Sequence, residues 1–306
     1  MRRKVIKQGS GGCTISLPID WVRKHGISPG EDVELKEDDN ALILTRAEEG
    51  GQLKKKEIAL AKQDLFFYRS LIGGLYRSGY DEIDIDLLDP HVLPGLQKTI
   101  NTFYGFEIFD ADKNSCKVKN IYPAEAKEVR PHLIRMIHMI TTMQSMLLED
   151  LKKGSYNSLE DMKQFRINVL KQRDLVARII TKNKLLNDDF FPFYRIVFSL
   201  GDIARGYELL YQNIPDRKGL SKKSIDFIRK VTVFFADSLA RLEKTRFKER
   251  HETYERLLEE AITLLRSPAA DPVVMTFSME ILLSVQSVNS SIFILPEKGW
   301  TKEKMR

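Results

Sequence analysis

The fold of the N-terminal segment is decided by three short runs of sequence, KVIKQG at residues 4–9, TISLP at residues 14–18 and GISPGEDVEL at residues 26–35. Residues 3–8 alternate around Val5 and precede a glycine-rich run at residues 9–12, so they predict a strand that reverses direction. A second strand is expected over residues 13–17. Together the two strands predict a hairpin at the start of the chain.

A short helix and a second hairpin are predicted to follow. Pro18 suits the first turn of a helix, Asp20 complements the positive helix end, and Gly26 suits the C-terminal cap. Residues 28–31 (SPGE) have turn chemistry, and apolar residues then alternate with acids on either side of a further turn within residues 33–44. The predicted order over residues 1–46 is strand, glycine turn, strand, helix and hairpin.

The charges of this segment separate along the chain. Residues 1–25 hold the single acid Asp20 and six bases, which are Arg2, Arg3, Lys4, Lys7, Arg23 and Lys24. Residues 26–45 hold six acids and the single base Lys36. Because so small a segment cannot bury these charges, we expect it to have one basic face and one acidic face.

In the order of its elements and in the three quoted runs, the segment resembles the swapped-hairpin DNA-binding head of the AbrB/SpoVT/MazE family. About 45 residues cannot bury a sufficient core alone, which gives a physical reason for two chains to interleave. The resemblance implies a β-barrel shared by an obligate homodimer, with double-stranded DNA as its partner.

The chain beyond the head is predicted to contain a linker and a small α/β module. Residues 47–58 are charged and include a Gly-Gly pair, which is typical of a linker. The module is expected over residues 59–122. Its predicted elements are helices at residues 65–78 and 93–104 and strands at residues 82–86, 107–109 and 117–121.

Residues 125–296 are predicted to form an all-α body. Apolar residues recur there at three- and four-residue steps, and capping residues such as Ser158 and the pair Asp271-Pro272 divide the pattern into six helices. Two sets of three antiparallel helices are the simplest arrangement. Residues 281–296 lack charge but are shorter than the roughly 20 apolar residues of a membrane span, so a buried helix without membrane insertion is expected.

This body resembles the two three-helix units of PhoU proteins, and the whole chain is similar to the archaeal branch that carries an AbrB-like head. The most specific stretch is SLGDIA at residues 199–204, similar to an acidic motif on the third helix of a PhoU repeat. Phe198 stands where that motif has a glutamate, and the comparable stretch at residues 284–288 has no acid. The resemblance implies a role in phosphate signalling and phosphate uptake.

The basic residues of the head are the first functional candidates. Arg2, Arg3, Lys4 and Lys7 lie on the first predicted strand, where two copies in a dimer would present about eight cations to DNA phosphates. Arg23 and Lys24 add two cations on the short helix. The alternative interpretation of the strand is a solvated edge that its lysines keep soluble.

A divalent metal site on the helical body is the second candidate, and no other cofactor is expected. Asp174 and Asp202, with Glu149 or Asp150, could converge as carboxylate ligands within a bundle. The alternative is that these acids pair with neighbouring lysines and arginines on helix surfaces.

Composition limits the classes of function. Cys13 and Cys116 are the only cysteines, and the chain start lacks the apolar core of an export signal, so a cytoplasmic protein without disulfides is expected. The sequence holds no recognisable set of nucleophile, base and orienting residue, so we expect no enzymatic activity unless the α/β module contains a pocket.

The leading hypothesis is a dimeric transcriptional regulator of phosphate uptake, with a DNA-binding head and a PhoU-like body. The rival hypothesis is a signalling adaptor that docks on a phosphate transporter, its ATPase or another signalling protein and uses the head only to dimerise. Salt-sensitive binding to duplex DNA would discriminate between them.

Overall fold

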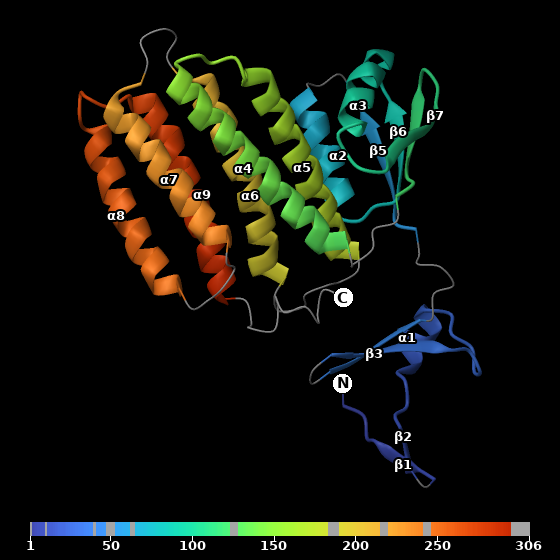
Figure 1. The fold of residues 1–306 in the computed structure, drawn as a ribbon. Coiled ribbons are helices and arrows are strands. Elements are labelled where there is room, and N and C mark those ends of the chain that lie inside the picture. The colour runs from blue at the N-terminus through green and yellow to red at the C-terminus, as the bar shows by residue number, and fades with distance from the viewer. Residues whose placement is uncertain are drawn as a thin grey trace. The chain divides into compact units, whose positions relative to one another are not determined.

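The computed structural model describes residues 2–9, 11–38, 41–46, 53–61, 65–122, 128–182, 190–214, 220–240 and 246–294. The chain divides into two compact units, Met1–Leu53 and Lys54–Arg306. Residues 47–52 of the predicted linker lie outside the described residues. The N-terminal unit corresponds to the predicted head, and the second unit contains both the α/β module and the helical body (Figure 1).

The head has the predicted order of elements. They are β1 (Ile6–Gln8), β2 (Gly12–Thr14), α1 (Ile19–Lys24), β3 (Val33–Asp38) and β4 (Ala41–Arg46). β1 pairs with β2 and β3 pairs with β4, both antiparallel, as two separate two-stranded sheets in the described part of the chain. Gly9 and Gly26 have φ values of 64° and 60°, the left-handed conformation that glycine adopts without strain.

The first strand is shorter than the sequence pattern predicts. β1 begins at Ile6, whereas the alternation predicts a strand from Arg3. The pairing of β1 with β2 spans only Ile6 to Gln8 opposite Gly12 to Thr14. Residues 3–5 have no partner strand in the described part of this chain, and an extended segment without a ladder is not a strand.

The α/β module is built on a four-stranded sheet within the described residues. Its elements are β5 (Lys55–Leu60), α2 (Leu65–Arg77), β6 (Glu82–Leu87), the 3₁₀ turn η1 (Pro90–Val92), α3 (Leu93–Ile100), β7 (Phe106–Ala111) and β8 (Ser115–Asn120). The strand order is β5-β6-β8-β7, with β5 parallel to β6 and the other neighbours antiparallel. β5 falls mostly within the predicted linker, so the module begins earlier than residue 59.

The core of the module lies between the apolar face of α2 and the apolar side chains of the sheet. Tyr68, Ile72 and Tyr76 recur every four residues on one face of α2, and Ile83 and Ile85 alternate along β6; all five are almost fully buried. Figure 1 places α2 between the sheet of the module and the helical body, and α2 packs against α5. The buried face of α2 therefore belongs to the module while another part of its surface meets the body.

The body contains six helices in the part of the chain that the structure describes, which confirms the predicted number. They are α4 (Val129–Lys153), α5 (Leu159–Lys182), α6 (Phe190–Gln212), α7 (Lys222–Ala240), α8 (Phe247–Leu265) and α9 (Pro272–Ile294). α4, α5 and α6 all contact one another, and so do α7, α8 and α9, while contacts of α6 with α9 and α4 with α7 join the two sets. The six helices form one bundle, in which α6 and α9 have the most extensive contact.

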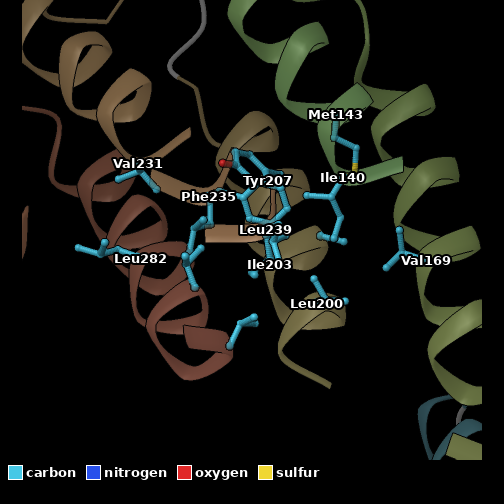
Figure 2. Close-up of a cluster of buried hydrophobic side chains, with 14 of the residues drawn as sticks. Ile140, Met143, Val169, Leu200, Ile203, Tyr207, Val231, Phe235, Leu239 and Leu282 are labelled. Atoms are coloured by element: carbon cyan, nitrogen blue, oxygen red, sulfur yellow. The ribbon is translucent and has the colours of Figure 1, made fainter. Parts of the chain in front are cut away.

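One continuous apolar core lies between these helices (Figure 2). Ile140 of α4, Ile203 of α6 and Phe235 of α7 contribute fully buried side chains to it. Tyr207 lies in this core and accepts a hydrogen bond from Gln144 Nε2 at 2.8 Å, which satisfies the buried hydroxyl. Burial raises the pKa of Tyr207 to about 12.

α9 is the most apolar helix of the body. By length and mean hydropathy, Pro272–Ile294 meets the criteria for a helix that could cross a membrane. Its residues Ile281, Leu282, Val285 and Val288 are nevertheless buried against the bundle, where α9 contacts α6, α7 and α8. Core helices of a globular bundle commonly pass the same test, and this packing matches the predicted buried helix.

Candidate nucleic-acid interface and arginine cluster

The six basic candidates of the head are all solvent-exposed. Lys7 lies in β1, opposite Cys13 of β2. Arg23 and Lys24 occupy the last turn of α1, where their charges complement the negative helix end. Arg2, Arg3 and Lys4 precede β1, so the basic candidates lie before a strand, within it and at a helix end rather than on one strand.

These cations are available to an external partner. In the described part of the chain, none of the six makes an ion pair or a side-chain hydrogen bond. By contrast, the acidic segment begins with an internal contact, because Glu31 Oε2 accepts a hydrogen bond from the Ser28 backbone N–H at 3.1 Å. Exposed cations without internal partners are what contact with DNA phosphates requires.

The head also exposes the apolar side chains that should form its core. Val5 is 66% exposed, Leu35 55% and Leu42 59%, and Ile15 and Ile19 are exposed to a similar degree. No described residue of the head belongs to a buried apolar cluster. A folded segment does not leave most of its apolar side chains in water, so these residues require a covering surface.

Asp174, the first predicted metal ligand, lies among arginines. Its side chain is 1% exposed, and Oδ1 accepts hydrogen bonds from Arg77 Nη1 at 3.1 Å and from Arg173 Nε and Nη2 at 2.9 and 2.7 Å. Arg69 Nη2 lies 4.0 Å from Oδ2. The buried carboxylate is thus balanced by guanidinium groups from α2 and α5.

The other predicted ligands do not gather around Asp174. Asp202 is on the exposed side of α6, close to Arg173 and Arg205, and loss of hydration raises its pKa. Glu149 pairs with Lys153 on the surface of α4, while Asp150 accepts hydrogen bonds from Ser158 and Tyr211. Among the described residues, no group of three or more histidine, cysteine, aspartate or glutamate side chains could hold a metal ion.

The structure instead reveals an arginine cluster, made of Arg69 and Arg77 on α2 with Arg166 and Arg173 on α5. Arg166 Nε lies 2.6 Å from Glu208 Oε2 on α6. The sequence alone did not predict this cluster. The seven-residue step from Arg166 to Arg173 places both on one face of α5, but the contribution of α2 cannot be read from spacing.

Phe198 gives the cluster an aromatic neighbour. Its ring centroid lies 4.8 Å from the guanidinium carbon of Arg173 and 5.9 Å from that of Arg77, as cation–π pairs. Tyr194, one turn earlier on α6, stacks on Phe198 with 4.3 Å between the ring centroids. The residue that departs from the acidic motif is therefore the one that packs against the arginines.

Comparison with known proteins gives a family match for the head. Residues 14–52 match the MazE antitoxin family, described as antidote-toxin recognition MazE, bacterial antitoxin. No curated protein and no solved structure significantly matches the chain. The family match spans the described elements from the end of β2 to β4. The N-terminal segment is therefore similar to MazE/AbrB-type domains, which bind DNA and form dimers.

Proposed function

We propose that this protein is a DNA-binding transcriptional regulator that dimerises through its head and acts in the cytoplasm. The observation that carries the proposal is the set of six exposed cations without internal partners in the described part of the chain. Arg23 and Lys24 lie within the residues 14–52 that match the MazE antitoxin family, and the other four lie just before this range. Cations of this kind displace condensed counterions when they meet DNA phosphates, which supplies affinity without requiring base contacts.

Dimerisation accounts for the exposed apolar side chains. A second copy of the head would offer the same apolar residues, including Leu35 and Leu42, in a self-complementary arrangement. Interleaving two heads doubles the apolar surface available to one core, which a segment of this size needs. The two copies would also bring two sets of basic residues to one duplex.

The helical body is proposed to report phosphate status to the head, and the protein as a whole to regulate phosphate uptake. The support is the resemblance of the body to PhoU proteins together with its two sets of three mutually contacting helices. This role needs no catalytic group. Regulation would then consist of a change in the body that alters the affinity of the attached head for DNA.

Fluorescence anisotropy with the full-length protein tests the proposal. A labelled duplex is titrated at several salt concentrations, with random sequence and with fragments upstream of phosphate-transport genes. Binding that weakens steeply as salt rises supports the regulator, and tighter binding to the upstream fragments supports the phosphate role. Absence of binding even at low salt would instead favour an adaptor that docks on a phosphate transporter and uses its head only to dimerise.

A further inference from the structure

We propose that the arginine cluster of Arg69, Arg77, Arg166 and Arg173 binds a phosphate oxyanion, either inorganic phosphate or the phosphoryl group of a small molecule. The site lies where α2 of the module meets α5 of the body, within the second unit rather than in the DNA-binding head. This inference deepens the proposed phosphate role, because it assigns a phosphate-binding site to the second unit, and it does not depend on DNA binding.

The cluster carries more positive than negative charge. Its four guanidinium groups face the carboxylates of Asp174 and Glu208, and Asp202 nearby also has Arg205 as a neighbour. Burial lowers the pKa of Arg69, and the adjacent Arg173, Arg166 and Arg77 lower it further, while Asp174 opposes them. Like charges held this close are stabilised when an anion joins them.

The guanidinium groups have N–H donors that are not used for the hydrogen bonds to Asp174. Each offers five N–H donors in a planar fork, whereas Arg77 and Arg173 use only some of theirs for Asp174. Arg69 makes no hydrogen bond within the described residues, and its closest carboxylate oxygen is 4.0 Å away. Arg69 is therefore the member with most capacity for a new ligand.

The cluster is sheltered but reachable. The side chains of Arg69, Arg77, Arg166 and Arg173 are between 16% and 32% exposed, so each can be reached from the solvent. Partial burial also strengthens an ionic hydrogen bond relative to one in open water.

Two glycines make room for two of the arginines. A Cβ atom at position 73 would lie 3.0 Å from Arg77 Nη1, and a Cβ atom at position 201 would lie 2.9 Å from Arg173 Cδ. Phe198 packs beside both guanidinium groups. The arginines are thus held in place before a ligand arrives, which reduces the entropy lost on binding.

A phosphate group fits this chemistry. Planar guanidinium forks bind its oxygens in pairs, and several arginines can share one tetrahedral anion. Because Arg69 and Arg77 come from α2 and Arg166 and Arg173 from α5, one bound anion would bridge the module and the body. Binding would therefore stabilise the contact between these two parts.

Isothermal titration calorimetry on the full-length protein without DNA provides the test. The probes are inorganic phosphate, a simple phosphate monoester and, as the anion control, chloride at matched ionic strength. The variants are Arg69→Gln, Arg69→Lys and the control Arg229→Gln, which removes an exposed arginine of α7 that pairs with Asp226. Arg69→Gln leaves Asp174 with Arg77 and Arg173, so the fold should persist, and circular dichroism checks this.

We expect phosphate or the monoester to bind the wild type, and Arg69→Gln to weaken that binding by roughly tenfold, equivalent to one charge-assisted hydrogen bond. Arg69→Lys should bind with intermediate affinity, and Arg229→Gln should match the wild type. Binding of the monoester alone would identify a phosphorylated small molecule as the ligand. Absence of binding by both probes, an equal response to chloride, or unchanged affinity in Arg69→Gln would overturn the proposal and leave the DNA-binding function untouched.

Discussion

Arg178 of α5 and Asp81, just before β6, form a buried ion pair that ties the helical body to the α/β module. Arg178 Nη2 donates to Asp81 Oδ1 at 2.6 Å, and the two side chains are 0% and 5% exposed. Arg178 Nη1 also donates to the backbone carbonyls of Tyr76 and Tyr80. The guanidinium therefore donates hydrogen bonds to backbone carbonyls at and just after the C-terminal end of α2, and it also neutralises the Asp81 carboxylate.

Replacing Arg178 with methionine should strongly destabilise the second unit. The change leaves Asp81 with Lys182 as its ionic partner and removes the Arg178 donor from two backbone carbonyls. The Tyr76 carbonyl keeps the Gly79 N–H as a donor, and the Tyr80 carbonyl loses its guanidinium partner. Removing one member of a buried pair costs about 3 kcal/mol or more of unfolding free energy. Urea unfolding measures the loss, with Arg229→Met as the matched control.

The control removes a half-exposed arginine whose pair with Asp226 should contribute at most about 1 kcal/mol. If Arg178→Met and Arg229→Met lower the unfolding free energy equally, the ion pair does not hold the module to the body.

Gly206 sets the close approach of α6 and α9. A Cβ atom there would lie 2.6 Å from Ile281 Cγ1, in a side chain that is 1% exposed. We expect Gly206→Ala to destabilise the protein by about 1–3 kcal/mol through overpacking, despite the better helix propensity of alanine. The thermal unfolding midpoint should fall accordingly.

Gly74 supplies the comparison for this substitution. It lies within α2, where an added Cβ atom would meet no neighbouring group within 4 Å, so Gly74→Ala should raise stability by up to about 1 kcal/mol. Equal shifts for both glycine variants would show that the contact between α6 and Ile281 is looser than the structure indicates.

Cys116 should be protected from thiol reagents in the native protein. It is 2% exposed in β8, and burial raises the pKa of its thiol to about 11, so little thiolate is available near neutral pH. Cys13 is exposed in β2 and should react with iodoacetamide, as mass spectrometry would show.

The raised pKa of Cys116 also makes the stability of the folded protein depend on pH. Because the native thiol has the higher pKa, its contribution to stability is complete below the ordinary pKa of 9 and is lost as the pH rises towards 11. Rapid labelling of Cys116 under native conditions at pH 8 would contradict the burial of this side chain in β8.

Leu35 should lie in the dimer interface. It is 55% exposed in β3, opposite Leu44 of β4, and a second head is the surface proposed to cover it. Sedimentation velocity should show a dimer for the full-length wild type and a monomer for Leu35→Asp, because a buried unpaired carboxylate opposes association.

Leu88→Asp is the matched control for dimerisation. Leu88 is 69% exposed in the second unit, and the same substitution there should leave the dimer intact. A wild-type monomer at micromolar concentration, or dissociation by Leu88→Asp alone, would place dimerisation elsewhere or exclude it.

The sequence predicted the helical body well because its signals are local. Ser158 precedes α5, and Pro272 is the first residue of α9. Capping residues therefore indicate where a helix begins, which the apolar periodicity alone does not determine. The strand β5 was missed because its first residues, Lys55, Lys56 and Glu57, look like a charged linker. As an edge strand beside β6, it buries only Leu60 fully and needs few apolar residues.

The candidate sites were harder to predict because they depend on residues distant in sequence. Asp174 was predicted as a metal ligand together with Asp202, yet its contacts are with Arg77, 97 positions earlier, and with Arg173 beside it. Such a cluster exists only once α2 packs on α5. The basic residues of the head could be found in the sequence because four of them lie within residues 2–7 and the other two, Arg23 and Lys24, are adjacent.

The central claim, that the head binds DNA through its basic residues, is tested most directly by the salt dependence of binding. In the full-length protein, Arg3 and Lys4 are replaced together by alanine, and the affinity for a labelled duplex is measured by anisotropy at several salt concentrations. The control variant replaces Lys222 and Lys223, two exposed lysines at the start of α7, and removes the same charge from the body.

Wild type and control should lose affinity steeply with salt, because each phosphate contact displaces a condensed counterion. In a dimer the Arg3 and Lys4 variant lacks up to four cations, so its log–log salt slope should be shallower by up to roughly 3–4 units, with the helical fold retained. Binding that is insensitive to salt, or identical slopes for the wild type and the Arg3 and Lys4 variant, would contradict the claim.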